Sequence, residues 1–380
     1  MPAPSEETPL EPLWLHRHAD VMAAALDPDT FSSAVSTHLN VPNGMDGAEH
    51  TRYRAVVDKY MTRERTAAIE PICQAVAEDL VADIPSGVPV DVVGGLGRRY
   101  AVRAQSQWLG WPAELEDPLL QWMEDNHGAT RSGELAETTQ IARRFDAIIT
   151  NLINSRRMAR VGGRSTPVDP TDELAHDFVG NAPLLLTEIV SILRNWTAGD
   201  LGTISRCVGS IVNHLAQNPE LQQDLRSRLL NPAGTDTAFL DAAIDEMLRI
   251  ENPFLSNRRK TTQARELGGH SIEAGRRVYL DWVEANRDPA VFGDPDAYRP
   301  TQNAASNLVY GIGKHVCPGR GLSTMELRVA TVELLNQTTA IMPAPVLENV
   351  RETAPLGGFG SVHVILTKKE FPAVHPSTEG

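Results

Sequence analysis

A single cysteine, Cys317, lies among residues suited to presenting its sulfur to a metal. Gly311 and Gly313 precede it and allow backbone angles that other residues avoid, so that a flat group can approach closely. Pro318 suits the first turn of a helix, and the apolar residues that come next recur at helical spacing: Leu322, Met325, Val329 and Val332. A helix that begins here favours the ionised thiolate through its positive end. The pattern suits an axial thiolate ligand of a haem iron, although an anion-binding loop or a plain loop would share it.

Composition places the chain among globular proteins and argues against several classes of partner. Hydrophobic residues make up 41% of its 380 residues and charged residues 22%, which is enough apolar material for a sizeable core. The net charge of −14 argues against nucleic acid and anionic membranes as main partners. Its three cysteines are too few and too far apart for a disulfide framework or a CxxC-type zinc site: Cys73, Cys207 and Cys317.

No segment has the pattern of a targeting signal or a membrane span. Residues 1–9 are acidic and polar, unlike the basic start of a signal peptide. The most apolar stretch, near residues 184–193, carries Glu188 and is too short to cross a bilayer. We therefore expect a cytoplasmic protein with neither a membrane nor a nucleic acid as partner.

Helical patterns dominate the chain and strand patterns are few. The spacing of apolar residues predicts helices over 50–82 with a break, 115–127, 138–159, 173–178, 184–217, 219–230 and 237–250. Strands are predicted at 257–262, 264–272 and 276–280, with a hairpin near 353–368 that turns at Gly357, Gly358 and Gly360. Residues 281–316 are mostly irregular, and a loop of that length needs something such as a buried cofactor to organise it.

Four further motifs occur in order along the chain, and each is weak alone. His50 and Arg54 lie four residues apart on one helical face, which suits the clamping of two carboxylates but is also common on a solvated face. Glu246 and Arg249 form an i, i+3 pair that would be an ordinary surface ion pair in most helices. Arg259 and the segment Glu284–Pro289 follow, and then the cysteine loop.

Taken together, from Trp14 onward, these motifs resemble the soluble bacterial cytochromes P450. The resemblance implies a mainly helical fold with small β-sheets, in which a haem b lies between a long distal helix and the helix after the cysteine. It implies one haem domain over 14–369, between an extended or disordered segment 1–13 and a flexible tail 370–380. Cys317 becomes the axial ligand of the iron, and Glu246 pairs with Arg249 beneath the cysteine loop. The implied cofactor-binding residues are His50, Arg54, Ala198, Gly199, Arg259, Tyr310, Gly311, His315, Cys317 and Gly319.

The distal helix departs from the family pattern of Ala-Gly-x-acid-Thr. With Ala198 and Gly199 aligned, Leu201 and Gly202 stand at the acid and alcohol positions, while Asp200 lies one residue early and Thr203 one residue late. Each displacement turns a side chain by about 100° around the helix. One hypothesis is a rearranged proton relay of Asp200, Thr203 and water. The alternative is an ion-paired structural Asp200 and a Thr203 bonded to its own helix backbone.

Other departures concern the cysteine loop and the front of the molecule. Tyr310 replaces the family's Phe, and its hydroxyl needs a partner if it is buried. Gln302 stands where the third member of the Glu246–Arg249 network is expected, and Arg299 could substitute for it. The family's opening helix and first strand are absent, because the segment from Trp14 already matches a later element, so we expect a more open entrance or one covered by another chain.

The resemblance implies a haem-thiolate monooxygenase that inserts one oxygen atom from O₂ into a small or medium-sized apolar molecule. Asp200 and Thr203 are the candidate catalytic residues, and a separate ferredoxin or flavodoxin with its reductase would supply electrons. The alternatives are a peroxide-driven oxygenase, an oxidative coupling or rearrangement catalyst, and a non-catalytic haem protein. The predicted substrate pocket is apolar, although each of its residues also suits the core: Trp196, Phe254, Leu255 and Phe359.

Overall fold

The longest helix, α8 (Leu186–Gln217), crosses the helical part of the molecule and packs against helices from both halves of the chain. It begins where the Glu188 carboxylate accepts a hydrogen bond from the Leu185 backbone N–H at 2.8 Å, which satisfies one free donor of the first turn. It ends at Asn218 because Pro219 starts the next helix. Gly199 and Gly202 lie inside it, and α8 continues through both.

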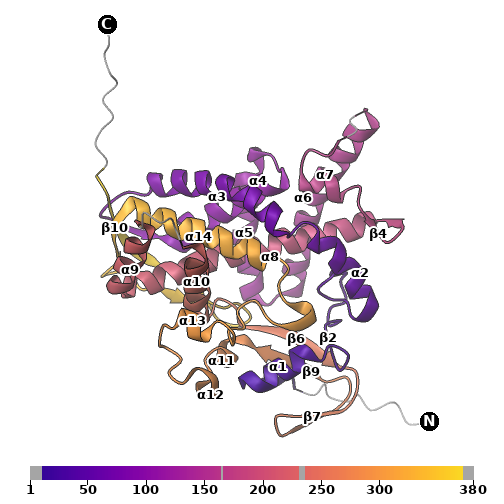
Figure 1. Cartoon of the computed structure of the whole chain (residues 1–380). Helices are drawn as coiled ribbons and strands as arrows, with labels where there is room; N and C mark the ends of the chain where they lie inside the picture. Colours follow the sequence, from indigo (N-terminus) through magenta and orange to yellow (C-terminus); the bar gives the residue numbers. More distant parts are fainter. Residues whose placement is uncertain (1–10, 164–165, 231–235, 371–380) are drawn as a thin grey trace, which may run out of the picture.

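Helices make up most of this computed structural model, which describes residues 11–163, 166–230 and 236–370. Figure 1 shows the helical bulk on one side of the molecule and α1 with a small sheet on the other. The other helices are α1 (His18–Leu26), α2 (Gly47–Asp58), α3 (Arg63–Asp83), α4 (Arg98–Leu109), α5 (Glu116–Ser132), α6 (Leu135–Val161), α7 (Pro170–Leu174), α9 (Pro219–Leu229), α10 (Thr237–Glu251), α11 (Trp282–Ala285), α12 (Pro289–Phe292), α13 (Pro300–Asn303) and α14 (Arg320–Gln337). Single turns of other helix types are the π-helix Val92–Gly97 and the 3₁₀ helices Ala113–Leu115 and Gly313–His315.

The strands form small separate sheets. A four-stranded sheet has the order β1 (Leu13–Leu15), β9 (Arg277–Asp281), β6 (Ser256–Thr261) and β2 (Phe31–Ser32), with β1 parallel to β9. A three-stranded antiparallel sheet has the order β10 (Thr338–Pro343), β13 (His363–Lys368) and β3 (Pro89–Asp91). The two-stranded sheets are β11 (Val350–Arg351) with β12 (Phe359–Ser361), β4 (Phe178–Val179) with β5 (Ala182–Pro183), and β7 (Arg265–Leu267) with β8 (His270–Ile272).

Two hydrophobic clusters hold these layers together. The larger one joins α3, α4, α8, α10 and α14, whereas the smaller one lies between α1 and the β1–β9 side of the four-stranded sheet, around Val21, Phe31 and Leu280. No helix within the described residues combines the length and the apolarity needed to cross a bilayer. That the haem domain is one unit over residues 14–369 stays a prediction, and its proposed terminal segments lie largely outside the described residues.

The predicted fold class is confirmed, with two corrections to its elements. The hairpin near 353–368 was paired wrongly: β12 pairs with β11, whereas β13 pairs with β10 and β3. The predicted helix over 173–178 is instead the short helix α7, which Asp169 caps by accepting a hydrogen bond from the Asp172 N–H. The irregular stretch 281–316 contains three single-turn helices, α11, α12 and α13.

Candidate functional site

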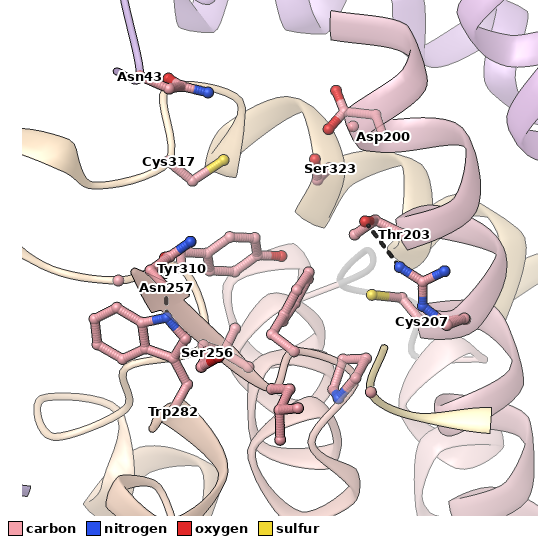
Figure 2. Close-up of a pocket in the computed structure, with 18 of the residues that line it drawn as sticks. Asn43, Asp200, Thr203, Cys207, Ser256, Asn257, Trp282, Tyr310, Cys317 and Ser323 are labelled. Atoms are coloured by element: carbon pink, nitrogen blue, oxygen red, sulfur yellow. Dashed lines mark hydrogen bonds between the residues drawn. The ribbon is translucent and has the colours of Figure 1, made fainter. Parts of the chain in front are cut away.

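A cavity of about 420 Å³ separates α8 from the cysteine loop. Cys317 lines one wall, and Asp200, Thr203 and Cys207 line the facing wall on α8. Figure 2 shows the sulfur of Cys317 on the side of the cavity opposite Thr203. Residues far apart in the sequence therefore meet around a space that could hold a small or flat molecule.

The turn before Cys317 has the shape that its glycines predict. Gly311 and Gly313 adopt φ values of +72° and +74°, where other residues are strained. A Cβ atom on Gly313 would also lie 3.1 Å from the backbone oxygen of Ala25, so the loop packs closely on α1. The backbone N–H of Cys317 donates to the oxygen of Tyr310 at 2.9 Å, which closes the loop and fixes the cysteine.

The protonation of Cys317 differs from what its place near α14 predicts. Burial raises the pKa of the thiol to about 12, and the nearby charge of Asp200 acts in the same direction. The backbone N–H of Gly319 favours the thiolate, but it does not offset burial. A metal cation bound to the sulfur would favour the thiolate against this effect of burial.

Two histidines and an arginine form a buried cluster beside the cysteine. The rings of His50 and His315 lie 4.3 Å apart, and Nδ1 of His50 and Nε2 of His315 are buried without a hydrogen-bond partner. The Arg259 guanidinium is buried on the cavity wall, and its recorded hydrogen bond goes to the backbone oxygen of the adjacent Arg258. Donors that remain unpaired under burial are costly unless a bound group supplies acceptors.

Burial and neighbouring cations outweigh the nearby carboxylate of Asp46 in their effect on the pKa values of this cluster, although Asp46 Oδ1 lies 4.0 Å from His315 Nε2. Burial lowers the pKa of His50, and the charges of Lys314 and Arg54 lower it further. Burial lowers the pKa of His315 to about 4, with further contributions from His50 and Arg259. A ligand with two carboxylates would add negative charge and supply acceptors for the unpaired ring nitrogens. The haem propionates are such a pair, so the residues present fit this cofactor.

The Arg54 guanidinium contacts the backbone of the cysteine loop, and its contact with the cofactor stays a prediction. It donates to the backbone oxygens of Val316 at 2.8 Å and Lys314 at 3.3 Å, and to Asp58 at 2.7 Å. It thus fixes the cysteine loop from outside. The His50–Arg54 pair is divided between the cavity cluster and the loop backbone.

Glu246 and Arg249 form a buried ion pair in α10, as predicted. Arg249 Nε lies 2.8 Å and its Nη2 2.9 Å from the two carboxylate oxygens of Glu246, and both side chains are almost completely buried. The third side chain was predicted wrongly. Gln302 and Arg299 are exposed, whereas Nδ2 of Asn303 donates to Glu246 at 2.7 Å and Arg299 contributes only its backbone N–H.

The distal segment of α8 places its residues around two cavities. Gly199, Asp200 and Thr203 line the main cavity, whereas Ala198 lines a smaller one of about 150 Å³ behind the helix. Ala198 therefore lies off the wall of the main cavity, and its contact with the cofactor stays a prediction.

Asp200 and Thr203 do not match the structural alternative, in which Asp200 is ion-paired and Thr203 bonds to its own helix backbone. Burial raises the pKa of Asp200 to about 7, and its carboxylate makes no ion pair with a described residue. The Thr203 hydroxyl accepts a hydrogen bond from Nη2 of Arg206 at 3.4 Å, which Figure 2 marks with a dashed line. The two side chains are thus available to the main cavity, one as an acid and one as a hydroxyl donor.

The predicted pocket residues divide between the cavity and the core. Phe254 and Leu255 line the main cavity, but Trp196 packs against Tyr60 and Trp108, with ring centres 5.0 and 5.4 Å away. Phe359 lines the smaller cavity and is covered by the Arg351 guanidinium at 4.2 Å. Asn43, Ser256 and Asn257 also line the main cavity, and they lie in the segments 32–47 and 253–257 that the resemblance places around the substrate. The sequence interpretation missed Ser323, for which no local motif exists.

Comparisons with known proteins agree on one family. The family model described as Cytochrome P450 matches residues 131–349. The chain is 27% identical to linalool 8-monooxygenase of Pseudomonas putida, over 82% of this chain and 79% of that protein. It is 29% identical to erythromycin C-12 hydroxylase of Saccharopolyspora erythraea, over 86% and 83% of the two chains. The crystal structure of CYP108D1 from Novosphingobium aromaticivorans has a TM-score of 0.80 at 22% identity and covers 97% of this chain and 90% of its own.

Proposed function

Because this chain belongs to the cytochrome P450 family, we propose that Cys317 is the axial ligand of its haem iron and that the cavity above it receives an apolar organic substrate. The chain is a haem-thiolate monooxygenase, an oxidoreductase with haem b as cofactor. The observation that carries the assignment of Cys317 is its half-buried sulfur, which faces the cavity beside Arg259 and two histidines, His50 and His315, that each have a ring nitrogen without a hydrogen-bond partner. When bound, the haem supplies O₂ activation at the iron.

The chain's own residues position the substrate and hold protons. Phe254 and Leu255 give the cavity an apolar wall for a small or medium-sized molecule. Asp200, with a pKa of about 7, holds a proton at its carboxyl in a useful range near neutral pH. In its bond to Arg206, the Thr203 oxygen accepts, so its own O–H is free to donate towards the cavity. These roles make Asp200 and Thr203 the proposed catalytic residues.

A separate electron donor fits the surface at the cysteine loop. Arg52 and Arg320 are exposed there and Lys314 is partly exposed, although Arg320 is paired with Asp245 at 2.9 Å. An acidic ferredoxin or flavodoxin would complement these cations despite the net charge of −14. We propose such a partner, with its reductase, in the cytoplasm.

One observation favours a second candidate function, oxygenation driven by hydrogen peroxide. No described hydrogen bond joins Asp200 to Thr203, and the in-register positions of the family's acid and alcohol hold Leu201 and Gly202. Product formation with ferredoxin, reductase and NADPH but not with peroxide would support the O₂-dependent function. Turnover with peroxide alone would support the second, and turnover with neither would indicate a non-catalytic haem protein.

The ligand assignment is tested by two matched cysteine variants. Both sulfurs line the same cavity, but only Cys317 lies on the loop side. Cys317→Ala should abolish the red-shifted Soret band that thiolate-ligated haem shows after reduction and addition of carbon monoxide. Cys207→Ala should retain it. A Cys317→Ala protein with the full parental spectrum would overturn the assignment.

A further inference from the structure

The Glu352 side chain is an enclosed carboxylate that the proposed function does not use. It follows β11 directly, its side chain is 2% exposed, and it lines the smaller cavity of about 150 Å³ behind α8. Oε1 lies 2.6 Å from Nε2 of His127 on α5, whereas Oε2 is buried and has no hydrogen-bond partner among the described residues. An acceptor left unpaired in a protein interior is costly, which indicates that a bound group completes it.

The segment between β11 and β12 holds this carboxylate inside the molecule. The backbone N–H of Glu352 donates to the oxygen of Gly358 at 2.9 Å, which closes the segment. A Cβ atom on Gly360 would lie 2.5 Å from Glu352 Oε1, so a side chain there would displace the carboxylate from His127. The backbone, the facing glycine and the histidine together fix the position of this acceptor.

The charges around the smaller cavity favour a neutral group over an ion. Its titratable side chains come from four segments: Arg98 on α4, His127 on α5, Arg206 on α8 and Glu352 after β11. Arg98 is paired with Glu124, and Glu352 attracts the half-buried Arg206 electrostatically. A cationic group would be repelled by the Arg206 guanidinium and an anionic one by Glu352. A neutral group that donates a hydrogen bond to Glu352 avoids both repulsions.

The smaller cavity adjoins the main one and suits the end of a longer molecule. Arg206 and Leu356 line both cavities. Trp122 and Phe359 give the smaller cavity apolar walls around its polar groups. Pockets for whole drug-sized ligands measure about 300–1,000 Å³, so the smaller cavity has room only for a terminal group.

We propose that the smaller cavity binds a neutral hydrogen-bond donor of the substrate, a hydroxyl or an amide group, and that Glu352 is its acceptor. The apolar body of the molecule then lies in the main cavity against Phe254 and Leu255, and its polar end passes Leu356. A hydrogen bond to a carboxylate is stronger than one between neutral groups, which offsets the desolvation of the donor. Because this assignment names the substrate class of the monooxygenase, it rests on the proposed function.

Imidazole probes report binding independently of turnover, because the imidazole shifts the Soret band when it binds the iron. The probes are 1-alkylimidazoles of increasing chain length that end in a methyl, a hydroxyl, a carboxamide or an ammonium group. We expect the parent protein to bind the best hydroxyl or carboxamide probe about 10-fold more tightly than the methyl probe of equal length. The two neutral series show which donor is preferred, and the ammonium probe should bind no more tightly than the methyl probe.

Two matched variants test the acceptor itself. Glu352→Gln keeps the shape of the side chain but replaces the charged acceptor by a neutral one, so the preference should fall to about 2-fold. Glu348→Gln makes the same chemical change at an exposed position between β10 and β11 that lines neither cavity, and it should keep the parental preference.

A third variant keeps Glu352 and all its contacts. Ala198 lines the smaller cavity but not the main one, so Ala198→Val narrows the smaller cavity alone. It should lower the affinity for the hydroxyl and carboxamide probes and leave that for short methyl probes unchanged. If Glu352→Gln does not fold, this variant decides, since an unchanged preference in it contradicts the proposal.

The outcomes separate the donor site from the proposed function. Equal affinities for methyl, hydroxyl and carboxamide probes at every chain length, or an undiminished preference in Glu352→Gln, would overturn the site while the carbon monoxide spectrum stays intact. Tightest binding of the ammonium probe would overturn the neutral class of ligand. Loss of the carbon monoxide spectrum in the parent protein would instead overturn the haem assignment.

Discussion

Two arginines, the buried Arg249 on α10 and the half-buried Arg206 on α8, behave in opposite ways. Arg249 donates to both oxygens of Glu246 and to the backbone oxygens of Asn286, Pro295 and Ala297. Arg206 has a single recorded bond, to Thr203, and a buried Nε without a partner. The hydrogen-bond donors of the guanidinium are thus paired at Arg249 and mostly unpaired at Arg206.

This difference in hydrogen bonding distinguishes the structural region around Arg249 from the ligand-binding region around Arg206. On the proximal side, the Glu246–Arg249 pair ties α10 to the segment before the cysteine loop, so this region is complete without any ligand. On the distal side, Asp200 and Arg206 are half-buried ionisable groups without an ion pair among the described residues, and beside the loop one ring nitrogen each of His50 and His315 is buried without a hydrogen-bond partner. Unsatisfied groups that line a cavity mark where ligands complete the structure.

The largest effect on stability is expected at Arg249, whose guanidinium is fully hydrogen-bonded. Arg249→Met leaves the Glu246 carboxylate buried without its cation, and we expect a loss of about 3–5 kcal/mol in the free energy of unfolding. Denaturant unfolding measures it. The matched control is Arg228→Met, which removes an exposed pair with Asp224 and should cost about 1 kcal/mol or less. Equal losses in the two variants would show that the buried Glu246–Arg249 pair contributes no more to stability than an exposed ion pair.

The free energy of unfolding should depend on pH through Asp200 on the distal side. Its pKa of about 7 in the fold lies above the ordinary 3.8, so between these values the native protein binds more protons than the unfolded chain. Stability contributed by this group therefore falls as pH rises through that window and levels off above it.

Asp200→Asn should remove this dependence. We expect the variant to match the parent near pH 4 and to be more stable by about 1–3 kcal/mol at pH 8, below the ceiling of about 4 kcal/mol set by the shift. Unfolding free energies measured across this range check it, with Asp58→Asn, an exposed partner of Arg54, as the control. Parallel pH profiles for parent and Asp200→Asn would contradict a buried, unpaired carboxylate.

The same contrast explains what could be predicted from the sequence. Glu246 and Arg249 lie on one helix and the cysteine follows its glycines directly, so local spacing was enough to place them. Asn303, the third partner of the network, comes from the single-turn helix α13, which has no periodic pattern. Trp196 was placed in the pocket by its position on α8, but Trp108 and Tyr60 from distant segments cover it.

Helix α4 and the pairing of β13 with β10 escaped prediction for different physical reasons. Helix α4 buries the polar residues Gln105 and Ser106, which obscures its apolar stripe, and it follows a glycine-rich π-helical turn that looks like a loop. The pairing of β13 with β10 joins segments across a 20-residue interval, and strand partners at such distances are set by tertiary packing. Both failures concern contacts that no local window contains.

The smallest expected effect on stability concerns Tyr310 in the cysteine loop. The Tyr310 hydroxyl and Thr324 Oγ1 lie 2.9 Å apart, and Thr324 also lies 3.5 Å from Asp245. Tyr310→Phe removes one neutral hydrogen bond while Thr324 keeps a second acceptor, so we expect a loss of about 0.5–1 kcal/mol and an unchanged carbon monoxide spectrum. A double-mutant cycle with Thr324→Val measures the coupling. A loss of stability as large as that of Arg249→Met would mean that the Tyr310 hydroxyl is an essential part of the same hydrogen-bonded network as Glu246 and Arg249.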